Sequence, residues 1–185
     1  MRFWNWPNTL TMTRIFVIPA FVACFFIPFD SHRYVAALIF LLAAVTDWLD
    51  GFLARYLKQT SPFGAFLDPV ADKLMVASAL VLLAAQYGSF WVTVAGIIIV
   101  AREIAVSALR EWMAELGKRA TVKVSSIGKV KTTVQMVAVL MLLSQPPVYN
   151  GIVIVGIWGL YIAVILTLWS MCIYLQAAYR EIKDL

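Results

Sequence analysis

Charged residues, cysteine and histidine are scarce in this sequence, and each scarcity excludes a class of protein. Asp, Glu, Lys and Arg make up 14% of the 185 residues, whereas 63% are hydrophobic, a composition outside the range of ordinary soluble domains. Cys24 and Cys172 both lie within apolar runs, so we expect neither a disulfide framework nor a Cys/His metal site. The single histidine, His32, is interpreted as a solvated loop residue. What remains is the composition of a polytopic membrane protein.

Long apolar stretches, by contrast, recur along the chain. A helix needs about 20 residues to cross roughly 30 Å of hydrocarbon, and six stretches reach this length, at residues 9–28, 34–55, 62–86, 91–111, 128–145 and 151–177. Short loops and the lack of an internal repeat predict one all-α domain over residues 1–185 with six transmembrane helices. Trp4 and Trp6 predict a short interfacial segment before the first helix, and Arg14 within the first apolar run argues against a cleaved signal peptide.

The basic residues are distributed unevenly between alternate loops. The loops on one side of the predicted membrane hold only one basic residue, Arg33. The loops and termini on the opposite side hold seven: Arg2, Lys58, Lys118, Arg119, Lys123, Arg180 and Lys183. Because the side rich in Lys and Arg stays in the cytoplasm, we expect both termini to face the cytoplasm. This bias explains most of the net charge of +5. A second interpretation of the charge is attraction to anionic lipid or to a phosphorylated substrate. Basic loops between spans argue against nucleic-acid binding.

Four aspartates interrupt the second and third apolar stretches, where carboxylates are costly. Asp47 and Asp50 are three residues apart and Asp68 and Asp72 are four apart, so each pair projects from one face of its helix. Both pairs lie roughly 8 to 15 Å from the cytoplasmic ends of their helices. Four carboxylates at one depth repel one another unless cations neutralise them.

A divalent metal is the simplest such cation. Oxygen ligands favour Mg²⁺ or Mn²⁺, and shared carboxylates suit two ions about 3.5 to 4 Å apart that stabilise both oxygens of a phosphoryl displacement. At this depth a lipid diphosphate would reach the ions while its acyl tails stay in the bilayer. The alternatives fit less well, because transporters place such sites near the midplane within repeated, broken helices and a structural scaffold has no use for four carboxylates.

Four residues between the aspartate pairs, Gly51, Ala54, Arg55 and Gly64, have two interpretations. The glycines would let a flat nucleotide base approach the backbone, and the Arg55 guanidinium could pair with a phosphate. Alternatively, glycine and alanine here only permit close packing of helices, and Arg55 extends its charge to the membrane interface.

These residues and the aspartates form one motif, which resembles the signature of the CDP-alcohol phosphatidyltransferase family. Its defined positions are all matched by Asp47-x2-Asp50-Gly51-x2-Ala54-Arg55-x8-Gly64-x3-Asp68-x3-Asp72. The resemblance implies a six-helix membrane fold, usually a homodimer, with a two-metal site. Such a site transfers a phosphatidyl group from a CDP-linked lipid to an alcohol and releases CMP.

The resemblance also implies roles for the individual residues. Asp47, Asp50 and Asp68 would be metal ligands. Asp72 would both contact metal and take the proton from the attacking hydroxyl, as the catalytic base. The CDP moiety would be bound by the small residues and the arginine between the pairs: Gly51, Ala54, Arg55 and Gly64.

Further stretches resemble the branch of the family that uses CDP-diacylglycerol as donor and glycerol 3-phosphate as acceptor: PNTLT followed by Arg14, then AREIAVSALREWMAELGKR and IGKVKTTVQM. An acceptor that carries a phosphate dianion needs a basic pocket. Five cations are predicted to form it: Arg14, Arg102, Arg110, Lys129 and Lys131. Branches that use serine, inositol phosphate or phosphatidylglycerol as acceptor are the alternative.

Several of these cations also have plainer interpretations. Arg102 can form an internal ion pair with its neighbour Glu103, Lys129 and Lys131 can be solvated residues of a first helical turn, and Arg110 can contact headgroups. Lys73, next to Asp72, is left out of the predicted site because a rotation of about 100 degrees per residue points it away from the aspartate face.

Overall fold

Six α-helices run through the part of the chain that the structure, a computed structural model, describes: residues 6–27, 29–56, 62–117 and 126–183. In chain order they are α1 (Trp6–Phe26), α2 (His32–Tyr56), α3 (Pro62–Tyr87), α4 (Phe90–Glu115), α5 (Ser126–Ser144) and α6 (Gly151–Lys183). No strand occurs within these described ranges. The all-α prediction is confirmed, and each helix overlaps one of the six predicted apolar stretches.

The helix boundaries follow from local residue preferences. α3 begins at Pro62, because the first turn of a helix does not need the N–H that proline lacks. Gly88 (φ 54°), between α3 and α4, and Gly117 (φ 70°), after α4, adopt the left-handed backbone that glycine tolerates. Trp6 is the first residue of α1 and Trp4 lies outside the described residues, so the interfacial segment stays a prediction.

Among the described residues, two helices are long and apolar enough to cross a membrane by themselves. These are α4 and α6, whose mean hydropathy reaches 2.0 and 2.5. Shorter apolar segments occur in α1 and α5, at Thr11–Phe26 and Val130–Ser144. α2 and α3 carry the aspartate pairs, and these charges lower the apolar content of any window that includes them. A membrane protein is therefore supported, whereas the prediction of six spans is not confirmed.

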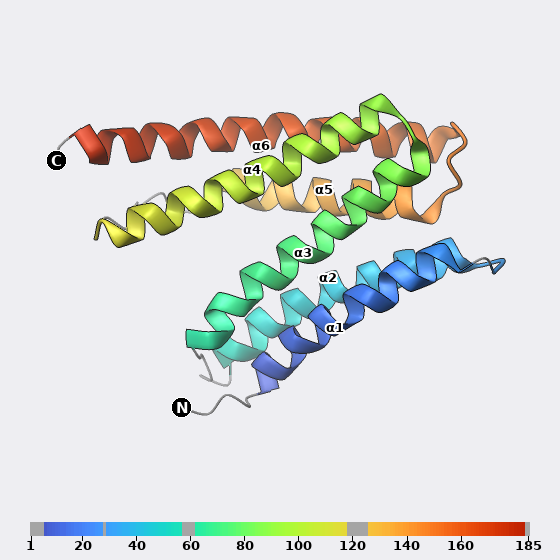
Figure 1. The fold of residues 1–185 in the computed structure, drawn as a ribbon, viewed down its shortest axis with the longest axis horizontal. Coiled ribbons are helices and arrows are strands. Elements are labelled where there is room, and N and C mark those ends of the chain that lie inside the picture. Colours follow the sequence, from blue (N-terminus) through green and yellow to red (C-terminus); the bar gives the residue numbers. More distant parts are fainter. Residues whose placement is uncertain (1–5, 28, 57–61, 118–125, 184–185) are drawn as a thin grey trace.

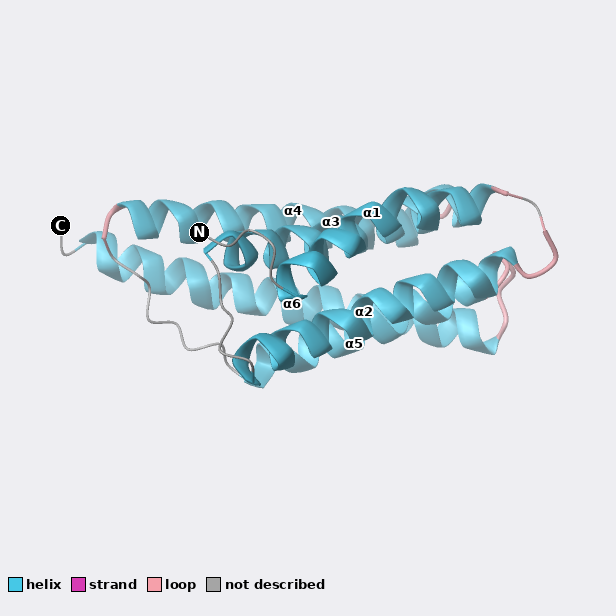
Figure 2. Ribbon diagram, turned by 90° about the horizontal axis from the view of Figure 1, so that it is seen from below, coloured by secondary structure: helices cyan, strands magenta, loops and turns pink. Residues whose placement is uncertain are grey.

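The helices form two groups that pack against each other (Figure 1). α1 packs on both α2 and α3, and α6 packs on both α4 and α5, while contacts of α3 with α4 and of α2 with α5 join the groups. The connections between α1 and α2, α3 and α4, and α5 and α6 lie toward one end of the molecule (Figure 1; Figure 2). α1 begins and α6 ends toward the opposite end, which is also where the aspartates of α2 and α3 lie.

Apolar side chains fill the space between the helices. Phe21 of α1 and Phe40 of α2 are buried, with ring centroids 6.3 Å apart. Gly156 lets α6 approach α5 closely, because a Cβ there would lie 3.0 Å from the Leu142 side chain. At the connection end, the Tyr87 hydroxyl donates to the Leu142 carbonyl at 3.1 Å and ties α3 to α5. This packing joins α3 to helices of the other group.

Candidate active site

Arg14 lies between two of the four predicted aspartates. Its Nη1 donates to Asp47 Oδ1 at 2.8 Å and to Asp72 Oδ1 at 2.6 Å, so side chains from α1, α2 and α3 meet at one nitrogen atom. The Arg14 side chain is only 6% exposed, whereas those of Asp47 and Asp72 are 41% and 40% exposed. A buried guanidinium therefore lies against two partly exposed carboxylates, and its single positive charge balances only one of them.

Asp68 is also held by α1. Thr11 Oγ1 donates to Asp68 Oδ1 at 2.5 Å, and Thr11 is fully buried. Thr11 and Arg14 are three residues apart and share one face of α1, so this face contacts aspartates on both neighbouring helices. Asp50 lies on α2, but its side chain is outside the described residues.

The chemistry of these carboxylates suits a hard divalent cation. Asp47 and Asp72 present oxygens to one shared volume, and oxygen ligands are those preferred by Mg²⁺ and Mn²⁺. A cationic group, the Arg14 guanidinium, already lies there. Within the described residues, no group of three or more His, Cys, Asp or Glu side chains is arranged to hold a metal ion. Asp47 and Asp72 supply oxygen donors of suitable chemistry, but the described residues do not by themselves form a metal site, and the side chain of the fourth predicted ligand, Asp50, lies outside them.

A pocket of about 390 Å³ opens beside Asp47 and Asp72. These two carboxylates line it from α2 and α3, and polar side chains of α4 and α5 also line it, among them Glu103 and Lys131. The volume falls in the range of small-molecule sites. The pocket therefore combines acidic groups that attract a cation with a cationic group that attracts an anion.

An ion network lies on the α4 and α5 side of this pocket. Glu103 Oε1 accepts from Lys131 Nζ at 2.8 Å and from Arg102 Nη1 at 2.7 Å, and Arg102 Nη2 also donates to Ser170 Oγ on α6. The side chains of Arg102 and Lys131 are both 7% exposed. Arg102 thus forms the internal ion pair that was its plainer interpretation. It is absent from the described residues that line the pocket, whereas Lys131 lines it.

The remaining predicted residues are placed as follows. Gly64 is buried in α3, and Arg110 is exposed on α4 and absent from the described lining residues of the pocket. Four predicted residues lie on helices but have side chains outside the described part of the structure: Gly51, Ala54, Arg55 and Lys129. Among the five predicted cations, Lys131 is therefore the one that the structure places in the lining of the pocket, and Arg14 lies against the aspartates.

Reasoning from the sequence missed several lining residues, of which Lys73 and Gln135 are two polar examples. Lys73, excluded above because of its helix face, lines the same pocket as Asp72, and its Nζ donates to Ser107 Oγ on α4. The lysine side chain is long and flexible, so it reaches the pocket although Lys73 is rotated about 100 degrees from Asp72 around the helix. Gln135, buried on α5, also lines the pocket. The spacing could have indicated Gln135, because it follows Lys131 by four residues and therefore lies on the same helix face.

Comparison with known proteins extends the similarity beyond the motif. The family model described as CDP-alcohol phosphatidyltransferase matches residues 4–169. Curated relatives from Sodalis glossinidius (strain morsitans) and Pectobacterium atrosepticum are each 57% identical over 181 residues, covering 97% of this chain and 98% of theirs. A relative from Shigella flexneri serotype 5b is 55% identical over 180 residues with the same coverage. All three are named CDP-diacylglycerol–glycerol-3-phosphate 3-phosphatidyltransferase.

Proposed function

The chain belongs to the CDP-alcohol phosphatidyltransferase family, and from this premise we propose that it transfers the phosphatidyl group of CDP-diacylglycerol to glycerol 3-phosphate. The products are phosphatidylglycerophosphate and CMP, and the reaction is the first step of phosphatidylglycerol and cardiolipin synthesis. The observation that carries the proposal is the 57% identity, over 97% of the chain, to relatives named for this activity. The contacts of Arg14 with Asp47 and Asp72, beside a pocket that also holds Lys131, support it.

Enzymes of this family generally use divalent metals, and the finer proposal is a pair of Mg²⁺ or Mn²⁺ ions. The ligands proposed are the motif aspartates: Asp47, Asp50, Asp68 and Asp72. Bound there, the ions would stabilise the charge on the attacking and leaving oxygens. The arrangement of Asp47 and Asp72 around a single guanidinium supports this choice, because one positive charge leaves one of the two carboxylate charges unbalanced.

Asp72 is proposed as the general base. The terminal hydroxyl of glycerol 3-phosphate gives its proton to the Asp72 carboxylate while its oxygen forms a bond to the phosphorus attached to diacylglycerol. The bond between that phosphorus and the CMP oxygen breaks, and CMP leaves with the electron pair. Support comes from the position of Asp72, whose partly exposed carboxylate lines the pocket. The reaction needs no covalent enzyme intermediate.

For the CDP moiety, the proposed contacts are the small residues and the arginine of the motif: Gly51, Ala54, Arg55 and Gly64. Gly64 is buried in α3, where a side chain would add bulk between helices. The other three lie on the last turns of α2, which follow Asp47 along the same helix. A nucleotide bound there would place its diphosphate beside the aspartates.

For the acceptor phosphate, the proposal now centres on Lys131, with Lys73 as a second cation of the same pocket. The ammonium of Lys131 carries three donors, and Glu103 accepts one of them. Arg102 is proposed to position Glu103, since it holds the same oxygen from the buried side. Arg110 and Lys129, nearer the proposed cytoplasmic surface, would attract the anion on its way in.

The proposal includes the membrane arrangement. All six helices would cross the bilayer, with both termini and the pocket on the cytoplasmic side of a bacterial inner membrane, and residues 1–185 would act as one unit within a homodimer. The bias of Lys and Arg toward one set of loops supports this orientation. The family resemblance supports the dimer.

An assay of CMP release tests the reaction. Purified protein is given CDP-diacylglycerol with glycerol 3-phosphate, serine or inositol phosphate, and CMP release is expected with glycerol 3-phosphate only. A sample depleted of metal by chelation should be inactive and recover with Mg²⁺ or Mn²⁺. Equal or faster release with serine or inositol phosphate would assign the chain to another branch of the family. Full activity after verified removal of metal would contradict the two-metal site.

A further inference from the structure

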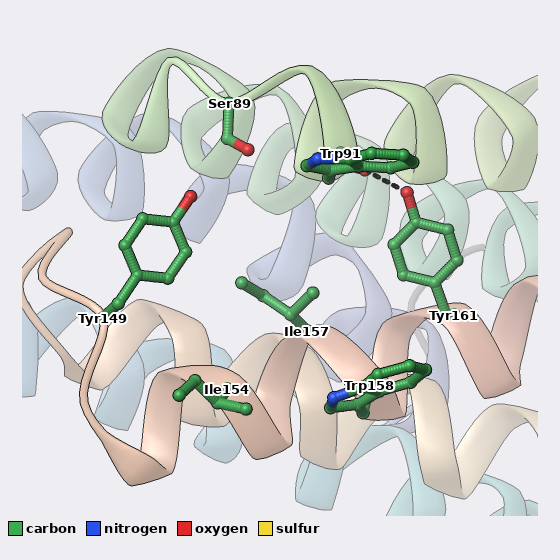
Figure 3. A pocket seen from close by; sticks show the side chains of 7 residues that line it. All are labelled: Ser89, Trp91, Tyr149, Ile154, Ile157, Trp158 and Tyr161. Atoms are coloured by element: carbon green, nitrogen blue, oxygen red, sulfur yellow. Dashed lines mark hydrogen bonds between the residues drawn. The ribbon is translucent and has the colours of Figure 1, made fainter.

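A second pocket (Figure 3) lies where the connections before α4 and α6 come together, at the end of the molecule that holds these connections in Figure 1. Its volume is about 400 Å³, and it is lined by the connection before α4, the first turn of α4, the connection before α6 and the first part of α6. The lining residues are mostly aromatic: Ser89, Trp91, Tyr149, Ile154, Ile157, Trp158 and Tyr161. The proposed reaction does not use this pocket.

One wall of this second pocket is fixed by polar and aromatic contacts. The Tyr161 hydroxyl donates to the Trp91 carbonyl at 3.0 Å, and the two rings meet edge to face with centroids 6.3 Å apart (Figure 3). At the other end, the Tyr149 hydroxyl points toward Ser89, whose own hydroxyl also lies on the pocket side (Figure 3). No charged residue is among the described lining residues. The pocket is thus apolar along most of its lining and carries hydroxyl groups at the Ser89 and Tyr149 end.

The pocket belongs to the membrane-facing surface of the chain. It is built on α4 and α6, the two helices that are long and apolar enough to cross a bilayer by themselves. Tyr149 and Trp158 are 64% and 67% exposed, so the pocket opens sideways, and Trp and Tyr are the residues enriched where a membrane meets water. From Ile154 to Tyr161 the lining follows α6 for about 10 Å, which is less than one leaflet of a hydrocarbon core roughly 30 Å thick.

We propose that this pocket binds one acyl chain of a bilayer glycerophospholipid, with the ester region of the lipid at Ser89 and Tyr149. The uncharged, aromatic body complements an alkyl chain, and the two hydroxyls complement the carbonyl oxygens at the head of that chain. The depth of the pocket matches one leaflet, and lipid surrounds the helices that form it. Because the occupant is a lipid of the leaflet opposite the active site, this site is separate from the proposed substrate sites.

Photolabelling with a defined lipid tests the proposal. The full chain is reconstituted in vesicles of phosphatidylethanolamine and phosphatidylglycerol that contain a trace of phosphatidylethanolamine with a diazirine close to the ester group of one acyl chain. Labelled peptides are expected to come from residues 89–92 and 149–161. Trp158→Ala should lower this labelling about tenfold, whereas Trp169→Ala should leave it within about twofold. The two tryptophans are a matched pair, because both lie on α6 and are 67% and 62% exposed, but only Trp158 lines the pocket.

Two further measurements decide between the possible occupants. Ile154→Trp fills the pocket without removing any packing and should also lower labelling, which covers the case that Trp158→Ala fails to fold. A photoreactive amino acid at position 154 should capture the lipid. Labelling spread evenly over the exposed faces of α4 and α6, equal losses in the two tryptophan variants, or capture of a second copy of the chain at position 154 would each overturn the proposal. Activity is not measured, so the result does not depend on the proposed reaction.

Discussion

Replacing Arg14 with methionine should destabilise the metal-free protein and increase its stabilisation by divalent metal. Arg14 donates to Asp47 at 2.8 Å and to Asp72 at 2.6 Å through one nitrogen, and methionine retains most of the apolar length without the charge. In the variant, two carboxylates face each other with no cation between them until a metal binds. Arg14 and the metal therefore compete for the same two carboxylates, Asp47 and Asp72.

The magnitude follows from the two hydrogen bonds. Each charge-assisted bond contributes about 1.5 to 3 kcal/mol. The carboxylates are 41% and 40% exposed, so solvent screening reduces the expected loss to about 2 to 4 kcal/mol. For a chain of this size, that loss lowers the melting temperature by about 4 to 16 °C. Arg110→Met is the matched control, because Arg110 is exposed and should cost about 0.5 kcal/mol or less.

The assay is thermal unfolding of detergent-solubilised protein, in chelator and in Mg²⁺. The variant should unfold at a lower temperature than the unmodified chain in chelator, and the increase on adding Mg²⁺ should be larger in the variant. Equal melting temperatures in chelator, together with equal or smaller increases with Mg²⁺, would show that Arg14 does not neutralise the aspartates. The Arg110 control separates this effect from a general loss of positive charge.

Three other substitutions test the pocket. Asp72→Asn should lower kcat by about 10² to 10⁴-fold while binding of CDP-diacylglycerol changes little, and loss of that binding with unchanged turnover would place the base elsewhere. Lys131→Met should raise KM for glycerol 3-phosphate about 10- to 150-fold, with KM for CDP-diacylglycerol nearly unchanged; an equal rise in both would exclude a specific acceptor contact. Glu103→Gln removes the negative charge between Arg102 and Lys131 and should cost about 3 to 5 kcal/mol, measured by thermal unfolding, whereas a change below about 1 kcal/mol would indicate that the network is not stabilising.

Much of the candidate site could be predicted from residue spacing, and some of it could not. The intervals between Asp47, Asp50, Asp68 and Asp72 identified the motif, because a helix repeats its faces every three or four residues. The partners of a long cation depend on helices that are distant in the sequence. Arg102 could equally have faced the pocket or Glu103, and only the packing of α4 against α6 brings its guanidinium to Ser170.

The sequence by itself determined the helical class, the family and the residues of the motif, because these depend on composition and on intervals within one segment. Helix boundaries such as Pro62 were equally local. The tertiary structure decided which side chains meet: Arg14 lies against Asp47 and Asp72, and Lys73 lines the pocket from which its helix face had excluded it. The physical reason is that an ion pair or a pocket depends on the distance between helices, and that distance is fixed by the packing of the whole chain.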